Sequence, residues 1–302
     1  MLRSTLLQLS ENQGFARWVT SNRTTRRMSH RFVAGEELDE AIAAARVCND
    51  QGMLVSLDYL GENVATAADV QRARDAYLEV FDRIAVEKLN ANVSCKLTQL
   101  GLDLSPEFCE GQVLSIVERA ASYDNFLRVD MEGSVYTEQT IELVKKVRSR
   151  SPAIGTVIQA YLYRSEQDIV DLLAIGCRIR LCKGAYKESP QIAYPRKEDV
   201  DANYVKLARL LLPSGFYHGI ATHDPRMIGA TIRIAAENKV AKDDFEFQML
   251  YGVRTDLQQQ LVRDGFRLRI YIPYGRDWFP YFMRRLAERP ANLGFFVRNF
   301  LR

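Results

Sequence analysis

Short apolar runs rich in β-branched residues recur along the chain, and most are followed by a segment with helical periodicity. The runs lie at 54–58, 93–97, 126–131, 154–159, 177–182, 216–222, 245–250 and 266–272. Helical patterns follow at 67–83, 107–121, 137–148, 166–173, 201–212 and 226–237, and one at 37–50 precedes the first run. Strands that alternate with helices form a parallel sheet through right-handed crossovers. Because eight such units close a barrel, the pattern predicts an α/β fold of the (β/α)8 TIM-barrel type.

An open, doubly wound sheet is the alternative fold for the same alternation. That fold places a Gly-x-Gly-x-x-Gly turn after the first strand when it binds a dinucleotide, and the sequence at 60–63 does not supply one. The barrel is therefore favoured. No linker rich in Pro, Gly or Ser divides the chain, so we expect one catalytic domain at 36–302, preceded by a helical extension at 1–35.

The composition excludes several classes of protein. The 302 residues are 47% hydrophobic and carry a net charge of +3. This charge does not indicate a surface that binds nucleic acid. No apolar stretch approaches the roughly 20 residues of a membrane-spanning helix. The five cysteines form no Cys-x-x-Cys pair and the three histidines no His-x-x-x-His pair, so we expect no metal site. Reduced cysteines and the lack of an apolar leader predict a cytoplasmic protein.

Polar side chains recur near the carboxyl ends of the predicted strands, where barrel enzymes place their active sites. Within several strands they occupy alternate positions and so share a face, whereas Lys183 and the run 222–224 stand at the ends of their strands. The set comprises Ser94, Lys96 and Thr98; Arg128, Asp130 and Glu132; Gln159; Arg178, Arg180 and Lys183; Thr222, His223 and Asp224; and Glu246 with Gln248. Six of eight strands with this feature indicate a shared polar cavity.

Individual members of this set have alternative interpretations. A solvated rim is the ordinary fate of a charge at a strand end, and Arg178 and Glu246 fit a rim position or an ion pair equally well. His223 fits a structural role as well as a hydrogen bond to a cofactor. Lys183 followed by Gly184 suits a phosphate, because lysine offers a point charge and glycine a close backbone approach, but this dipeptide is common.

The segment 276–288 predicts a last helix, with Asp277 as N-cap and apolar residues at 279, 282 and 286. Arg284 and Arg285 point about 100° apart on such a helix, so they can hold one carboxylate from two sides. The alternative is a solvated basic face with an Arg284–Glu288 pair.

Eight motifs together resemble the bacterial monofunctional proline dehydrogenases, in order and over about residues 31–292. They begin at Lys96 (KLTQLGLD), Arg128 (RVDME), Gln159 (QAYLYR), Arg180 (RLCKGAY), Ala221 (ATHDP), Glu246 (EFQMLYG), Tyr271 (YIPYG) and Arg284 (RRLAERPAN). Cys182 stands where the family pattern has an aliphatic residue.

The resemblance implies a distorted barrel with extra N-terminal helices, a final helix over the barrel mouth and non-covalent FAD. It also implies oxidation of L-proline to Δ1-pyrroline-5-carboxylate, the first step from proline to glutamate, with hydride transfer to flavin N5. A membrane quinone as electron acceptor is implied as well, with a peripheral position at the inner face of the membrane. The chain is too short for the aldehyde-dehydrogenase domain of bifunctional relatives, so a separate pyrroline-5-carboxylate dehydrogenase is expected.

Residue roles follow from the same resemblance. Asp130 and Arg180 match the active-site carboxylate and the arginine near flavin N5. The expected substrate-binding residues are Lys96, Arg284, Arg285, Tyr274, Leu250 and Tyr186. The expected cofactor-binding residues are Met131, Gln159, Arg180, Lys183, Gly184, Ala185, Thr222 and His223, with Glu288 in a pocket or helix-positioning role.

Two functions of other kinds fit a polar barrel mouth. A Schiff-base lyase or aldolase would use Lys96 or Lys183 as its nucleophile. A barrel without catalysis would serve as a binding or scaffold module. The visible absorption of a flavin, bleached by proline, separates the dehydrogenase from both.

Overall fold

The computed structural model describes residue 19 and residues 29–61 and 64–288, with the backbone alone for the last two. Eight parallel strands form a closed barrel in sequence order, which confirms the predicted fold and excludes the open sheet. The strands are β1 (Leu54–Tyr59), β2 (Ala91–Cys95), β3 (Leu127–Val129), β4 (Ile154–Gln159), β5 (Arg178–Cys182), β6 (His218–Ala221), β7 (Phe245–Leu250) and β8 (Leu268–Tyr274). The predicted helical extension at 1–35 lies largely outside the described residues, so the boundary at residue 35 stays a prediction.

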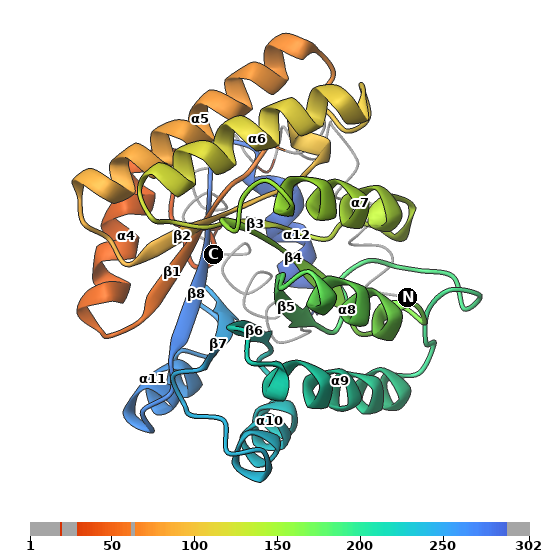
Figure 1. Cartoon of the computed structure of the whole chain (residues 1–302). Coiled ribbons are helices and arrows are strands. Elements are labelled where there is room, and N and C mark those ends of the chain that lie inside the picture. Colours follow the sequence, from red (N-terminus) through yellow and green to blue (C-terminus); the bar gives the residue numbers. More distant parts are fainter. Residues whose placement is uncertain (1–18, 20–28, 62–63, 289–302) are drawn as a thin grey trace.

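Helices surround the strands and alternate with them along the chain (Figure 1). They are α4 (Leu38–Asp50), α5 (Ala67–Val86), α6 (Pro106–Ser122), α7 (Thr137–Arg148), α8 (Ser165–Ala174), α9 (Lys197–Leu211), α10 (Pro225–Glu237), α11 (Thr255–Arg263) and α12 (Trp278–Glu288). The sequence encodes several of their starts. Thr66 forms a capping box with Asp69, Ser105 caps α6 and Asp224 caps α10. No helix among the described residues is long and apolar enough to cross a membrane.

The main hydrophobic core lies between the strands and the helices, outside the barrel. Val55 and Leu57 of β1, Phe247 of β7 and Ile272 of β8 are among its fully buried members. Along each strand these apolar residues alternate with residues that point into the barrel, because the side-chain period of a strand is two. The inward positions are largely polar, unlike the branched apolar layers that fill most barrels of this type.

Charged side chains occupy the floor of the barrel. Arg269 forms a bidentate ion pair with Glu246, with Nε–Oε1 at 2.6 Å and Nη2–Oε2 at 2.9 Å. Arg128 donates to the carbonyls of Thr156 and Arg178 at 3.0 and 2.9 Å. Burial, helped by the neighbouring charge of Arg180, lowers the pKa of Arg128 to about 9. The inward face is thus held by specific polar contacts as well as by packing.

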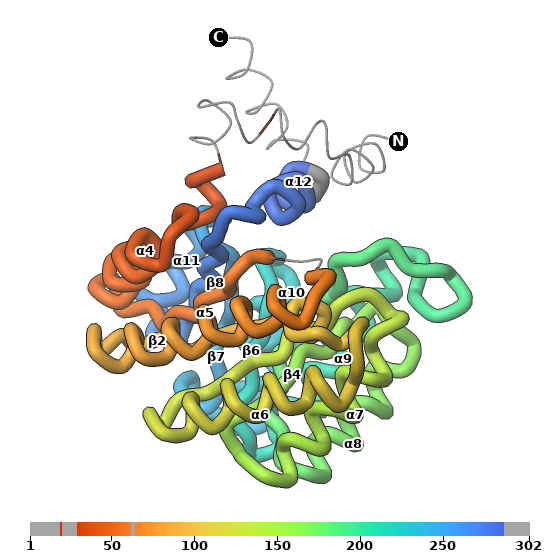
Figure 2. Tube along the Cα trace, turned by 90° about the horizontal axis from the view of Figure 1, so that it is seen from above, coloured from red at the N-terminus to blue at the C-terminus, as the bar shows by residue number. Residues whose placement is uncertain are grey.

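The last helix, α12, lies across one end of the barrel and stands apart from the outer ring of helices (Figure 2). It packs in a second hydrophobic cluster, separate from the main core. Trp278 and Phe282 of α12 belong to it together with Phe32 and Leu60, and the Trp278 and Phe282 rings meet edge to face with centroids 5.8 Å apart. The expected helix over the barrel mouth is confirmed.

His218 is buried in β6 and neutral. Its Nδ1 accepts a hydrogen bond from the backbone N–H of Ile179 at 3.0 Å, so the ring proton is on Nε2, which lies 2.9 Å from Ser214 Oγ. Burial, together with the charge of Arg128, lowers the pKa of His218 to about 3. An unfolded histidine titrates near a pKa of about 6.5.

We predict that His218 makes the folded state acid-sensitive. Below a pH of about 6.5, His218 binds a proton in the unfolded chain, whereas the buried ring of the folded state stays neutral. The free energy of unfolding therefore falls as pH drops below about 6.5, by about 1 kcal/mol per pH unit. The decline continues until the ring itself titrates near pH 3. Urea unfolding of His218→Gln between about pH 7 and pH 5, above the carboxylate range, should show a flatter pH dependence than the parent. His30→Gln, at an exposed histidine, is the matched control; an equal flattening there contradicts the assignment.

Candidate active site

A cavity of about 660 Å³ opens at the carboxyl ends of the strands and beneath α12. Most of the side chains that the sequence singled out line it together. These are Lys96, Asp130, Met131, Gln159, Arg180, Lys183, Gly184, Ala185, Tyr186, Thr222, His223, Leu250, Arg284 and Arg285. In the structure, polar side chains at the ends of several strands therefore line one cavity, as the sequence predicts.

Tyr274 differs from the expectation. Its side chain is not among the described residues that line the cavity; it packs on Tyr59 with ring centroids 5.4 Å apart, inside the main core. Tyr271 of the same strand lines the cavity instead. The reason is strand parity, since Tyr274 shares its face with Ile272 while Tyr271 shares its face with Arg269. The side chain of Glu288, also expected here, lies outside the described residues.

Cations gather at one side of the cavity. Lys96, directly after β2, is 8% exposed and lies 3.4 Å from the buried carboxylate of Asp58. Arg284 and Arg285 reach the same cavity from α12, where the Arg285 guanidinium lies 5.1 Å from the Tyr281 ring. Three cations, Lys96 from the end of β2 and two from α12, thus face one space.

Arg180 of β5 is fixed by partners around its guanidinium. Nη1 donates to Asp130 Oδ1 at 2.6 Å and Nη2 to Ser94 Oγ at 3.0 Å, while Nε contacts the Gln248 amide oxygen. The Tyr271 hydroxyl donates to the other oxygen of Asp130 at 2.8 Å. Burial, and then the charge of Asp130, raises the pKa of Tyr271 well above its usual value, so this hydroxyl stays a donor.

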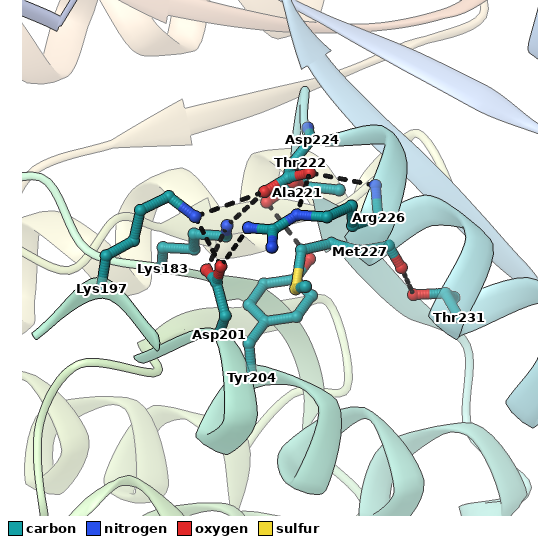
Figure 3. Close-up of polar contacts among 10 residues, drawn as sticks. All are labelled: Lys183, Lys197, Asp201, Tyr204, Ala221, Thr222, Asp224, Arg226, Met227 and Thr231. Carbon is teal, nitrogen blue, oxygen red and sulfur yellow. Dashed lines mark hydrogen bonds and ion pairs between the residues drawn. The ribbon is translucent and has the colours of Figure 1, made fainter. Parts of the chain in front are cut away.

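A second charge cluster lies where the loop after β5, helix α9 and the start of α10 meet (Figure 3). Lys183 Nζ lies 2.5 Å from Asp201 Oδ1 and 2.8 Å from Asp224 Oδ2. Lys197 and Arg226 also contact Asp201, at 2.5 and 2.7 Å. Burial opposes ionisation of Asp224, but the contact with Lys183 outweighs it and lowers the pKa of Asp224 to about 2. Three cations and two carboxylates leave this cluster with one excess positive charge.

These ion pairs bear on the lyase interpretation. A nucleophilic lysine has to present a neutral amine to its substrate. Lys96 contacts Asp58, and Lys183 contacts Asp201 and Asp224. Carboxylates beside both ammonium groups disfavour this chemistry.

Neutral donors and acceptors line the space between the two charged sides. Gln159 Nε2 donates to the Glu132 carbonyl at 3.0 Å, so its Oε1 faces the backbone N–H of Ala185 at 3.4 Å. His223 Nε2 accepts from the backbone N–H of Leu250 at 2.9 Å, so the neutral ring carries its proton on Nδ1. Backbone contacts thus orient both side chains.

Gly184 allows the loop after β5 to press against Tyr161. It has φ +118°, and a Cβ at this position would lie 2.5 Å from Tyr161 Cδ1. The same loop is tied to the segment between β3 and α7, where Glu188 accepts from the backbone N–H and the hydroxyl of Ser134 at 2.8 and 2.5 Å. The loop that carries Lys183, Gly184 and Ala185 is therefore fixed from two sides.

Sequence reasoning did not assign several residues of the site. Asp58 was not among the polar strand ends that the sequence singled out, and Ser94, Gln248 and Tyr271 received no individual role. For Ser94 and Gln248 alternation was the available signal, because they lie on the same strand faces as Lys96 and Leu250. Cys182 lines the cavity, and burial raises the pKa of its thiol to about 12, so it stays protonated.

Comparison with known proteins agrees with this geometry. The model of the proline dehydrogenase family matches residues 41–298. The chain belongs to the proline dehydrogenase family. Proline dehydrogenase 1 of Bacillus subtilis (strain 168) is 40% identical over 302 residues, which is 100% of both chains. The proline dehydrogenase of Deinococcus radiodurans is 38% identical over 280 residues, covering 91% of this chain and 90% of that one.

A solved structure shares the fold. Proline utilization A (PutA) of Bdellovibrio bacteriovorus, inactivated by N-propargylglycine, matches with a TM-score of 0.83 and 26% identity. The match covers 95% of this chain and 36% of that longer chain. Family membership makes this chain a flavin-dependent oxidoreductase that oxidises proline, the first step of proline catabolism.

We predict that Gly184→Ala weakens flavin retention. The new methyl group collides with Tyr161 at a backbone φ that side chains avoid, at a cost on the order of 1–3 kcal/mol. The absorbance ratio of flavin to protein after gel filtration should fall. Gly111→Ala, which meets nothing within 4 Å in α6, is the control and should keep the flavin. Full flavin content in Gly184→Ala would contradict the assigned role of this loop.

Proposed function

We propose that the flavin is FAD, bound without a covalent link, and that this cavity converts L-proline to Δ1-pyrroline-5-carboxylate. The observation that carries the proposal is the convergence of Lys96, Arg284 and Arg285 on one cavity that also presents the apolar side chain of Leu250. A small amino acid with an anionic end and an aliphatic ring matches this combination.

The three cations serve as a clamp for the substrate carboxylate. Guanidinium groups bind carboxylates through charge-assisted, often bidentate hydrogen bonds. Arg285 is 9% exposed and Lys96 8%, so water competes weakly for their charges. Held in this way, the ring of proline lies against Leu250 and Tyr186, and its orientation is fixed before reaction. The proposed role of Tyr274 as a ring contact is replaced by one for Tyr271, which faces the cavity.

The residues present fit a dinucleotide. The cavity extends across the barrel. The residues that line it lie at the end of β2 and, about half-way round the closed ring of strands, at the ends of β5 and β6. The excess positive charge near Lys183 and Lys197 suits phosphate, and the close backbone approach at Gly184 suits a ligand laid along the loop. Met131, Gln159, Ala185, Thr222 and His223 line the same cavity and complete the proposed FAD site.

FAD, when bound, supplies the acceptor for the hydride that leaves the proline ring carbon next to nitrogen. The chain's own residues provide the electrostatics of that step. Arg180 is 6% exposed and its charge is balanced by one direct carboxylate contact, from Asp130. A fixed cation at this place stabilises negative charge that develops during the reaction. Asp130 in turn is held by the Tyr271 hydroxyl.

Further parts of the proposal come from the family resemblance. Electrons pass to a membrane quinone, which requires peripheral association with the inner face of the membrane from the cytoplasmic side. A separate pyrroline-5-carboxylate dehydrogenase consumes the product. Residues 36–302 form the catalytic domain and residues 1–35 a helical extension. Glu288 positions the last helix.

The visible absorption spectrum of the purified protein, before and after addition of L-proline, tests this function. A flavin spectrum that proline bleaches supports the dehydrogenase. Borohydride trapping of a substrate imine on Lys96 or Lys183 would support a lyase instead, and colourless protein without proline-dependent dye reduction would leave a binding module.

We predict that Arg285→Ala raises the KM for proline while flavin stays bound. Removing one partner of a buried charge pair costs about 2–5 kcal/mol, or roughly 30-fold and more in KM. Arg276→Ala is the matched control, because this arginine on the approach to α12 is 78% exposed and pairs with Glu37. Steady-state kinetics at matched flavin content decide the outcome: an unchanged KM in Arg285→Ala, or an equal rise in Arg276→Ala, refutes the clamp.

A further inference from the structure

A continuous chain of buried hydrogen bonds leads from the barrel floor to Arg180. It begins with the Arg269–Glu246 ion pair. Gln248 Nε2 donates to Glu246 Oε1 at 2.5 Å, and the other end of the same amide, Oε1, accepts from Arg180 Nε. All four side chains are at most 9% exposed. Gln248 is thus the single link between the floor and the catalytic arginine in this chain of contacts.

The ionisation of Glu246 decides which way the Gln248 amide faces. Burial opposes the charge of Glu246, but Arg269, with hydrogen bonds from Tyr217 and Gln248, holds the pKa of this carboxyl below its ordinary value. An ionised carboxylate only accepts hydrogen bonds, so Gln248 must present its NH2 group to Glu246. The carbonyl oxygen then faces Arg180. A flipped amide would set NH2 against a guanidinium N–H and a carbonyl against a carboxylate.

The neighbouring strand leaves room for this amide. Gly219 of β6 pairs with Glu246 in the sheet. A Cβ at Gly219 would lie 2.3 Å from Gln248 Nε2 and 2.8 Å from its amide carbon. Because Gln248 is held at both ends, it has no free rotation with which to avoid such a group. A glycine here keeps the bridge intact.

The amide also controls the charge balance of Arg180. Its oxygen accepts a hydrogen bond from Nε without carrying a formal charge, whereas the Asp130 carboxylate accepts from Nη1 and carries a negative charge. Ser94 adds a neutral acceptor at 3.0 Å. All three guanidinium nitrogens therefore have partners, and of these partners in the described part of the chain Asp130 alone is anionic.

We propose that Gln248, oriented by Glu246, is a positioning residue that fixes the Arg180 guanidinium while leaving its positive charge only partly neutralised. The consequence rests on the proposed placement of the flavin beside Arg180. An incompletely balanced arginine stabilises negative charge on the reduced flavin more than a fully paired one does, so Gln248 helps to set the reduction potential of the bound flavin.

The test compares two substitutions at this position in the flavin-loaded enzyme. Gln248→Glu keeps the shape but adds a charge, so the two-electron midpoint potential should fall by about 30 mV, the equivalent of tenfold in equilibrium. The kcat should fall roughly tenfold as well, with KM little changed, because the carboxylate clamp is untouched. Gln248→Met removes the acceptor without adding charge, so kcat should fall with a smaller shift in potential.

Two further variants separate positioning from packing. Gly219→Ala leaves Gln248 in place but displaces its amide, so it should reproduce the loss of kcat seen in Gln248→Met. Gln99→Met removes another buried amide, one that donates to the Tyr59 carbonyl away from Arg180, and should leave the potential unchanged. A potential shift in Gln99→Met as large as in Gln248→Glu overturns the proposal.

Arg180→Lys distinguishes failure of this inference from failure of the proposed function. If Arg180→Lys changes neither potential nor kcat, the placement of Arg180 beside the flavin is wrong. If Arg180→Lys lowers both while Gln248→Glu lowers neither, only the role of Gln248 falls. If Gln248→Glu cannot be purified with bound flavin, Gln248→Met alone tests the proposal. A kcat equal to that of the parent enzyme in Gln248→Met then overturns it.

Discussion

The ion pair between Arg269 and Glu246 places opposite charges at the floor of a closed barrel, where the carboxylate is 1% and the guanidinium 9% exposed. Desolvating such charges costs several kcal/mol per ion unless hydrogen bonds satisfy them. The surroundings meet this demand from several strands, with Tyr217 and Gln248 on the carboxylate and the Val55 carbonyl on Arg269. The inward-facing side chains of neighbouring strands therefore make polar contacts. The apolar packing that stabilises the barrel lies on its outer side.

The active site is the next layer of the same arrangement. Two residues beyond Arg128, Glu246 and Arg269 along their strands come Asp130, Gln248 and Tyr271, which surround Arg180. The site is thus built on strands whose preceding inward-facing residues are already held by charged hydrogen bonds and an ion pair. Catalytic constellations on such elements hold their geometry better than those on loops. The loop after β5 is the exception, and its contacts through Gly184 and Glu188 compensate for the lack of regular structure.

Much of this could be predicted from the sequence because two periodicities are strong. The alternation of strand and helix gave the barrel, and the period of two within strands placed Lys96, Asp130 and Arg180 on one face. The strand boundaries were less certain: the run at 126–131 yields only Leu127–Val129, and β8 extends to Tyr274. The exchange of Tyr274 for Tyr271 follows from the same parity. Partners across the barrel, such as Asp58 for Lys96, could not be predicted, because they depend on strand register and side-chain reach.

The separate packing of α12 has a consequence for how this protein loses activity under stress. Local unfolding follows the boundaries of cooperative units, and a small cluster opens at lower free energy than the main core. The cluster of α12 rests on Phe32, Val33 and Leu60, while the main core surrounds the barrel. Heating or mild denaturant should therefore release the helix that carries Arg284 and Arg285 while the strands still hold together. Inactivation would then precede the loss of secondary structure, and cooling would restore activity without refolding of the barrel.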